Sequence, residues 1–381
     1  MKSKKMLPLL SLFLVLFSCT TKNEEFKKNI LGEWKFIKFV DTKTAVSNNG
    51  KLLRLPAQPS FELSTQGYVF SEKDSCEVKM GYFKRVDSEE WEKRRTFYLG
   101  NKTKYEIKDD SLKILNLSTK KWVKQKIYSI SEDTLTFQFS DSTFAKFAKI
   151  RYKPDPKESY DHIMVSSSGC YGICPIMDIR LDKNGDVLYY GNRYNTQNGI
   201  FKSKISVAQY KSIENSFKKA DLKNLKNAYS ADISDQEEVT ITFVKDNKIV
   251  KSISDYGREA PMEFTWAYTP VRFLYQQLKL KPEKFETPLL SLSGFSFTKG
   301  KMELYLTKSE SFYLLTELQK PKTSNSTFEN EYKIEFWNDK NKKEVIFTDG
   351  RFYKIKGITF DLGYNLLIEN NLESKFTKSP N

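Results

Sequence analysis

The sequence predicts a β-rich protein of several domains: an N-terminal all-β barrel or meander, followed by two α+β domains with antiparallel sheets. Three observations predict this fold class. Short runs in which apolar and polar residues alternate recur through residues 29–152. Two prolines, Pro154 and Pro156, then interrupt the chain among charged residues. Beyond them, capping boxes at Ser206 and Thr307 each predict a helix among strand-like segments.

The N-terminal segment has the layout of an export signal. Basic residues open it, an apolar run extends from Met6 to Phe17, and polar residues follow Cys19. The run is too short to span a bilayer comfortably. Leu16-Phe17-Ser18-Cys19 resembles a lipobox, with leucine at the third position before the cysteine and a small residue directly before it.

The lipobox resemblance implies that residues 1–18 are a lipoprotein signal peptide and that the chain is cleaved before Cys19. The thiol and amine of Cys19 would be acylated, palmitate being one such acyl group, and residues 19–28 would form a polar tether. The protein would then be held at the outer membrane, on its periplasmic or its cell-surface face. A plain secretory signal or an uncleaved anchor is the alternative.

The chain is strongly basic, with a formal net charge of +15 that falls to +12 when Lys2, Lys4 and Lys5 leave with the signal. A strongly positive net charge often indicates an anionic partner. Here the lysines are scattered among acidic residues, and an exported protein rarely meets nucleic acid, so we expect no nucleic-acid partner. A solvated lysine-rich surface is predicted, with weak attraction to lipid phosphates as the sharper hypothesis.

Residues 29–152 form the predicted β domain. Its alternating runs include Trp34–Phe39, Lys126–Ile130 and Thr134–Phe139. Gly32-Glu33-Trp34 resembles the G-x-W signature of lipocalins, and the segment is similar to the lipocalin-like domains of bacterial lipoproteins. The resemblance implies that Trp34 plugs the barrel floor beneath Arg151. Such a barrel either holds a small apolar ligand or is filled by its own aromatic side chains.

Residues 159–281 are predicted to be an α+β domain. Strands flank the Asn184-Gly185 turn, and a second hairpin surrounds residues 245–248. The capping box at Ser206 predicts a helix between these hairpins. Pro270 is expected at the first position of a closing helix that extends through Leu278.

Cysteine use fits an oxidising compartment. Apart from Cys19 the chain has Cys76, Cys170 and Cys174, so one thiol must stay unpaired, and the local pair Cys170 and Cys174 is the natural bridge. Cys76 is then a lone, packed thiol. A redox or copper site that uses Cys170, Cys174 and the single histidine, His162, is the alternative, because two thiolates suit a soft metal. The C-x-x-x-C-P string also resembles copper chaperones of the Sco type, but a strand follows it here instead of their helix.

The cysteine loop also resembles a domain family of unknown function found in lipoproteins of Gram-negative bacteria. The shared features are the loop itself, the segment Lys202–Ser206, the pair Tyr229-Ser230 and the string Asp255-Tyr256-Gly257. The similarity covers about residues 160–280 and implies a fold and a compartment but no activity. It further implies that Cys170 and Cys174 close a tight loop in which Gly172 relaxes the turn.

Residues 283–381 are predicted to be a smaller α+β domain. The capping box at Thr307 introduces a helix, and a hairpin pairs Tyr332–Phe336 with Glu344–Phe347. Asp349-Gly350-Arg351 follows this hairpin as Tyr256-Gly257-Arg258 follows the corresponding one. This common order favours a diverged repeat of the preceding domain.

The residues predict binding in preference to catalysis. We expect no catalytic constellation, no metal site and no cofactor, since the serine, lysine and glycine patterns of known enzymes are incomplete. The predicted function is a non-catalytic binding or scaffolding role for a lipid-anchored protein of the cell envelope. Its expected partners are the membrane through the lipid anchor, and a small apolar ligand or another envelope protein.

Overall fold

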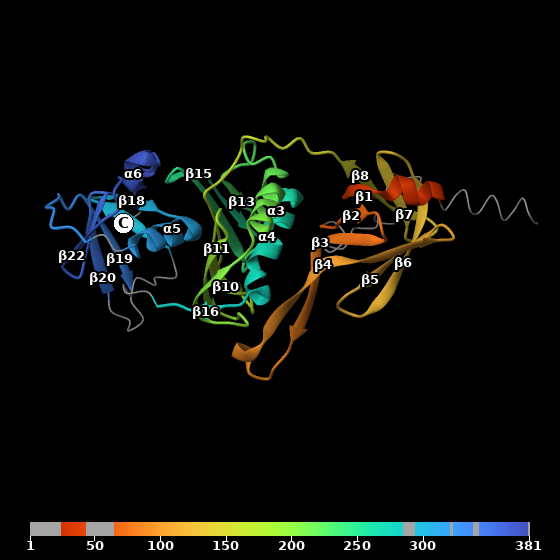
Figure 1. Cartoon of the computed structure of the whole chain (residues 1–381), viewed down its shortest axis with the longest axis horizontal. Helices are drawn as coiled ribbons and strands as arrows, with labels where there is room; N and C mark the ends of the chain where they lie inside the picture. Colours follow the sequence, from red (N-terminus) through yellow and green to blue (C-terminus); the bar gives the residue numbers. More distant parts are fainter. Residues whose placement is uncertain (1–23, 43–64, 285–293, 321–322, 338–342, 380–381) are drawn as a thin grey trace, which may run out of the picture. The chain divides into compact units, whose positions relative to one another are not determined.

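The computed structural model describes residues 24–42, 65–284, 294–320, 323–337 and 343–379. Strands dominate these residues, and the chain divides into two compact units (Figure 1). One unit contains the residues up to Lys84 together with Tyr98–Lys153, and the other contains Arg85–Phe97 together with the residues from Pro154 onwards. Cys19 and the predicted signal peptide lie outside the described residues.

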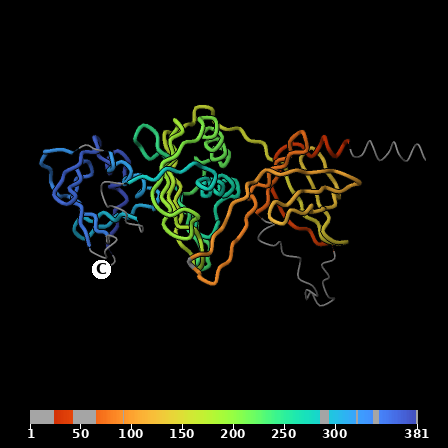
Figure 2. The backbone as a smooth tube through the Cα atoms, turned by 60° about the horizontal axis from the view of Figure 1, so that its bottom comes forward, coloured from red at the N-terminus to blue at the C-terminus, as the bar shows by residue number. Residues whose placement is uncertain are grey.

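The first unit is a closed antiparallel barrel, which confirms the barrel predicted from the alternating runs (Figure 2). Its strands follow one another around the barrel, and β1 closes it by pairing with β8 from Glu33 to Asp41. The strands are β1 Gly32–Asp41, β2 Gly67–Ser71, β3 Ser75–Val86, β4 Arg95–Lys108, β5 Ser111–Asn116, β6 Lys121–Ile130, β7 Thr134–Gln138 and β8 Thr143–Ile150. A 3-10 turn, η1 Trp91–Lys93, lies between β3 and β4.

Aromatic side chains pack inside the barrel. Phe147 lies at the centre of this packing, with its ring 5.6 Å from Phe36, 5.6 Å from Tyr68 and 5.4 Å from Phe137 between ring centroids. The contacts of Phe147 with Phe36 and Phe137 are edge-to-face, and such contacts add stability beyond the burial of apolar area. Aromatic side chains of the chain itself therefore form part of the barrel core.

A helix over residues 24–30 precedes β1, and it corrects the predicted tether of residues 19–28. Phe26 and Ile30 stand one helical turn apart, and both are buried in the barrel core. The surrounding lysines and glutamates make this segment look like a polar linker in the sequence. The apolar pair instead fixes it to the barrel, so a tether can extend no further than residue 23.

The second unit begins with an eight-stranded sheet of order β13-β15-β14-β9-β10-β11-β12-β16. All neighbours are antiparallel except β13 and β15, which run parallel. The strands are β9 His162–Ser167, β10 Ile176–Asp182, β11 Asp186–Arg193, β12 Gly199–Lys204, β13 Ala228–Ser230, β14 Glu238–Lys245, β15 Lys248–Tyr256 and β16 Lys281–Pro282. Tight turns join β10 to β11 and β14 to β15, where the sequence predicts hairpins.

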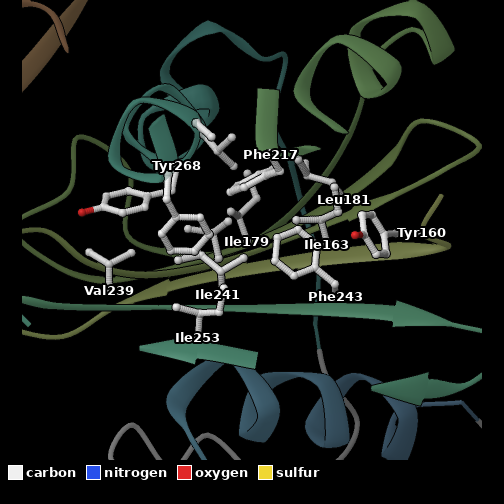
Figure 3. Packing of buried hydrophobic residues seen from close by; sticks show 14 of the residues in the cluster. Tyr160, Ile163, Ile179, Leu181, Phe217, Val239, Ile241, Phe243, Ile253 and Tyr268 are labelled. Atoms are coloured by element: carbon white, nitrogen blue, oxygen red, sulfur yellow. The ribbon is translucent and has the colours of Figure 1, made fainter. Parts of the chain in front are cut away.

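Two helices cover one face of this sheet, α3 Val207–Lys218 and α4 Met262–Arg272 (Figure 3). Between the sheet and these helices lies a core that includes Ile179, Phe217 and Phe243. Ser206 caps α3 in a capping box with Gln209, as predicted. Nearly all residues of β9, β10 and β14 are buried, and alternate ones, such as Ile163 and Val165 of β9, belong to this core.

The closing helix was predicted in the wrong place. Pro270 lies inside α4, two residues before the last residue of the helix, Arg272, and a 3-10 segment, η2 Leu274–Gln277, follows. Proline has no N–H, so the last turn of α4 lacks the hydrogen bond that this N–H would make to the carbonyl four residues earlier. Proline here marks the end of a helix whose first residue is Met262.

A seven-stranded sheet of order β22-β21-β20-β19-β17-β18-β23 completes the second unit. Its strands are β17 Ser296–Lys299, β18 Met302–Tyr305, β19 Tyr332–Trp337, β20 Lys343–Thr348, β21 Phe352–Ile355, β22 Ile358–Asp361 and β23 Thr377–Lys378. The helices are α5 Lys308–Leu318, capped by Thr307 as predicted, α6 Leu366–Glu369 and the 3-10 turn η3 Glu373–Lys375. Helix α5 packs on the face of the preceding sheet that α3 and α4 leave uncovered (Figures 1 and 3).

The two sheets share a local strand order. In the first sheet the neighbouring strands β15-β14-β9-β10 come from the segments before and after α3 in the chain. In the second sheet the neighbouring strands β20-β19-β17-β18 come from the segments before and after α5. In both, the first strand of the hairpin that follows the helix pairs with the first strand of the segment before the helix: β14 pairs with β9, and β19 pairs with β17. In the first sheet β13 lies between α3 and β14 in the chain. This order agrees with the diverged repeat that the sequence favours, which stays a prediction.

Candidate functional site

A disulfide joins Cys170 and Cys174 in the loop between β9 and β10. The N–H of Gly172 donates to the carbonyl of Cys170 at 2.7 Å, which gives the bridged loop its tight turn. The N–H of Tyr171 donates to the carbonyl of Asp235, and the N–H of Ser168 to that of Glu238. The loop is thereby fixed to the segment before β14, while the Tyr171 side chain is 88% exposed.

His162 lies at the opposite end of β9 from this loop. In the pairing of β9 with β10, His162 stands opposite Asp182, whereas Ser167 stands opposite Met177 beside the cysteine loop. Five residues of an extended strand separate the two positions, which is about 17 Å. The structure therefore does not bring His162 together with Cys170 and Cys174.

His162 instead belongs to a buried polar network around Arg180. Its Nδ1 lies 2.7 Å from Asp182 Oδ1, and the Arg180 guanidinium contacts the same carboxylate with Nε at 2.7 Å. Arg180 Nη1 donates to Glu317 of α5 at 3.0 Å and to Thr316 Oγ1 at 2.7 Å. Burial alone would raise the pKa of Asp182, but the hydrogen bond to His162 and the charge of Arg180 hold that pKa below its ordinary value.

Further polar contacts fasten α5 to the same sheet face. Lys308 Nζ donates to Asp178 Oδ1 at 2.6 Å, and the Ser309 and Thr242 hydroxyls lie 2.8 Å apart. The N–H of Ser309 donates to Thr240 Oγ1 at 3.0 Å. These side chains are buried, apart from the partly exposed Lys308, and they satisfy one another's hydrogen bonds, so the network holds α5 against the sheet in one register.

A second buried polar cluster lies near the disulfide loop. Asp255 accepts hydrogen bonds from the Ala260 N–H and the Tyr268 hydroxyl, both at 2.9 Å. Burial raises the pKa of Asp255, and it also raises the pKa of Glu237, which pairs with Arg272. These contacts position the start of α4 against the sheet.

Asp255-Tyr256-Gly257, one of the strings on which the family resemblance rests, has structural roles beside this cluster. The Tyr256 hydroxyl accepts from the Gln236 N–H at 3.0 Å, which fixes the segment that holds the disulfide loop. Gly257 has a φ of +73°, and a Cβ atom there would lie 2.6 Å from the Cβ of Ala231. Only glycine fits this turn without a shift of the neighbouring backbone.

Trp34 lies in the barrel core, and the residue over its ring is not Arg151, the partner that the lipocalin resemblance implies. Trp34 is fully buried and donates from Nε1 to the Ile30 carbonyl at 2.6 Å. Lys149 lies over the ring, with Nζ 4.8 Å from the ring centroid, because Lys149 stands directly opposite Trp34 in the pairing of β1 with β8. Arg151 lies beyond the end of β8 and pairs with Glu132 and Asp133.

Cys76 is a buried free thiol in the barrel core. Burial raises its pKa far above the ordinary value, so the reactive thiolate is suppressed.

The two cysteine environments make thiol titration informative. In a Cys19→Ser variant we expect no reactive thiol in the native protein, because Cys76 is buried and the other two are bridged. Unfolding without reductant should expose one thiol, and unfolding with reductant should expose three. Three thiols in the absence of reductant, or stoichiometric copper binding by the native protein, would contradict the structural assignment of the bridge.

A cavity of about 370 Å³ lies in the second unit, beside the outer edge of β15. One wall is formed by Ile249–Ser252 of β15 and another by Leu304–Thr307, and residues near the C-terminus complete it. Strand β13 covers the edge of β15 only at Ser254–Tyr256, so the β15 residues that line the cavity have no neighbouring strand there among the described residues.

The cavity combines apolar and polar side chains. Lys251 and Lys375 contribute positive charge, and burial lowers the pKa of Lys251, whose Nζ donates to the Leu225 carbonyl. Glu310 is the acidic residue among the lining side chains, and it accepts the N–H of Thr307 in the capping box of α5. The full lining is Asn227, Ile249, Val250, Lys251, Ser252, Leu304, Tyr305, Leu306, Thr307, Glu310, Asn370, Leu372 and Lys375.

Within the described ranges, no group of three or more His, Cys, Asp and Glu side chains is arranged to hold a metal ion. No described helix is both long enough and apolar enough to cross a membrane.

The structure is that of a β-rich protein with a closed barrel and a sheet domain that contains a disulfide. Residues 161–275 match the family model described as Domain of unknown function (DUF6438), and the chain therefore contains a DUF6438 domain. This range begins at β9 and ends in η2, so it takes in the disulfide loop and both helices α3 and α4. No curated protein and no solved structure matches the chain.

Proposed function

We propose that this chain is a lipid-anchored protein of the bacterial outer membrane with a non-catalytic binding role. The single observation that carries the anchor is Leu16-Phe17-Ser18-Cys19 behind a short apolar run with a basic start. The Cys170–Cys174 bridge supports an exported protein, because disulfides persist in oxidising compartments. Replacement of Cys19 by serine tests the anchor, since it removes the atom that would carry the lipid.

The cavity beside β15 is the candidate binding site. Its volume lies within the range of about 300–1,000 Å³ that is common for small-molecule sites. Apolar residues such as Leu304 and Leu306 suit an apolar body, and Lys251 and Lys375 suit an anionic group. A bound anion would stabilise the charged form of Lys251, which burial disfavours. The ligand class that fits is therefore a small amphipathic anion, such as an organic acid or the carboxyl end of a peptide.

Native mass spectrometry of the protein purified from envelopes in mild detergent tests this site. We expect a noncovalently retained small molecule that is lost from the double variant Lys251→Met/Lys375→Met. The matched control, Lys211→Met/Lys279→Met, removes the same charge from exposed lysines that do not line the cavity, and it should retain the molecule.

Two results would count against the cavity. A bare protein in every preparation would remove the evidence for a retained ligand. An apolar compound that survives in the Lys251→Met/Lys375→Met variant would place the ligand in the barrel, as the lipocalin-like resemblance implies.

A further inference from the structure

Strands β6, β7 and β8 of the barrel form a continuous basic segment of its wall. Together they contain no aspartate or glutamate, and they contain five lysines: Lys121, Lys124, Lys126, Lys146 and Lys149. The rest of the chain mixes lysines with acidic residues, so a stretch of three neighbouring strands with one sign of charge is distinctive.

Cross-strand pairing places several of these side chains on the outer surface. Lys126 stands opposite Gln138, and Gln138 stands opposite Phe144. In the next row Lys146 pairs on one side with Thr136 and on the other with Lys38 of β1. Ala145 and Phe147, which alternate with Phe144 and Lys146 on β8, are in the barrel core. The rows that contain Lys126 and Lys146 therefore face away from the core, whereas Lys149 lies over the buried Trp34.

Apolar side chains are exposed among these lysines. Tyr128 is 62% exposed, and its ring centroid lies 4.7 Å from that of Phe144. Ile37 is 52% exposed at an irregularity of β1, next to Lys38. We call this surface the lysine–aromatic face, and its residues are Ile37, Lys38, Lys126, Tyr128, Phe144 and Lys146.

Two acidic residues at the end of this part of the barrel pair with an arginine and not with the lysines of the face. Glu132 and Asp133 lie in the turn between β6 and β7, where both pair with Arg151. Lys38, Lys126 and Lys146 are exposed and carry their charge at the surface. The face thus offers positive charge around an amphipathic tyrosine, which is the composition that suits the headgroup region of an anionic bilayer.

We propose that the lysine–aromatic face lies on the anionic phospholipid surface of the membrane that carries the anchor. The proximity of that membrane rests on the proposed lipidation of Cys19. Only residues 20–23 separate Cys19 from the helix that Phe26 and Ile30 fix in the barrel, and five extended steps span at most about 18 Å. The anchor would hold the barrel within reach of the headgroups, and the basic face would select which side of the barrel approaches them.

Vesicle binding by the chain that starts at Thr20 tests this face separately from the lipid. We expect cosedimentation with vesicles of phosphatidylglycerol and phosphatidylcholine in equal parts, and no binding to phosphatidylcholine alone. Binding should weaken as salt is raised, because salt screens the attraction. Each lysine near such a surface contributes about five-fold in partitioning, so the variant Lys38→Gln/Lys126→Gln/Lys146→Gln should bind on the order of 100-fold more weakly.

A matched control lies on β4, on another side of the barrel. Lys102, Lys104 and Lys108 are exposed there, with Glu106 among them, and their replacement by glutamine removes the same total charge. This control and the charge-conserving variant Lys38→Arg/Lys126→Arg/Lys146→Arg should both bind nearly as well as the unchanged chain.

Two outcomes would overturn the proposal. One is equal loss of binding in the β4 control, which would mean that total charge and not this face attracts the vesicles. The other is absence of binding to the anionic vesicles at low salt. Because the tested chain lacks Cys19, neither outcome depends on whether the natural protein is acylated.

Discussion

Replacing Arg180 by methionine is expected to lower the free energy of unfolding by about 3–5 kcal/mol. Arg180 is buried between the sheet and α5, where its guanidinium contacts Asp182 and Glu317. Without the arginine, these two largely buried carboxylates lose a counterion. Thr316 loses a hydrogen-bond donor. Lys320 still contacts Glu317, which places the expected cost at the lower end of the range.

Urea unfolding of the intact chain measures this cost, and two further variants identify its origin. The double variant Arg180→Met/Glu317→Met also removes the Glu317 carboxylate, which loses its arginine partner in the single variant. It should therefore recover part of the lost stability. Arg351→Met breaks an exposed pair with Asp361 and should cost less than about 1 kcal/mol. If Arg180→Met were as mild as Arg351→Met, the network would not hold α5 in place.

The same network gives a pH dependence with a definite sign. The pKa of Asp182 in the folded chain lies below its ordinary value of about 4, so the folded state favours the charged carboxylate. This stabilisation is fully present above the unfolded pKa and is lost as the pH falls through the folded pKa. Part of the acid sensitivity below about pH 4 should therefore disappear in Arg180→Met.

Replacing Cys19 by serine is expected to move the chain from the membrane fraction to the soluble fraction of lysed cells. The lipid would supply most of the attachment, because each buried CH₂ group of an acyl chain contributes about 0.8 kcal/mol. Cys76→Ala is the matched control: it also removes one cysteine, but from the barrel core, and it should leave the chain in the membrane fraction.

A high-salt wash separates the lipid from the lysine–aromatic face. Electrostatic attraction to headgroups is screened by salt, whereas an acyl anchor is not. The unchanged protein should therefore stay in the membrane fraction after the wash. If the Cys19→Ser chain also stayed there after the wash, the anchor would have to be something other than a lipid on Cys19.

Much of the fold could be predicted from local patterns. Alternation predicts the barrel strands because one face of each is buried, and the two capping boxes predict α3 and α5 because their hydrogen bonds are local. The predicted bridge between Cys170 and Cys174 is present for the same reason, since the loop that it closes is short.

The predictions from sequence were wrong where contacts between residues far apart in the sequence determine the structure. Lys149 and not Arg151 covers Trp34, because the pairing of β1 with β8 sets which residue is opposite the ring. The helix over residues 24–30 depends on two apolar side chains that find their partners in the barrel. Neither register nor partner is visible in a polar stretch of sequence.

The buried polar face of the DUF6438 domain could not be recognised from alternation alone. Asp178, Arg180 and Asp182 alternate with apolar residues along β10, a pattern that usually indicates a solvent-facing side. Here α5, from more than a hundred residues further along the chain, covers that side. Alternation shows which face is apolar, but only the structure shows what covers the other.

Mass spectrometry of the N-terminal peptide of the protein isolated from cell envelopes tests the anchor most directly. Lipidation predicts a peptide that begins at Cys19, with a diacylglycerol on its sulfur and a fatty acyl group on its amine. A peptide that begins at Met1 or at another residue, or one with an unmodified Cys19, would contradict a protein held at the membrane by lipid.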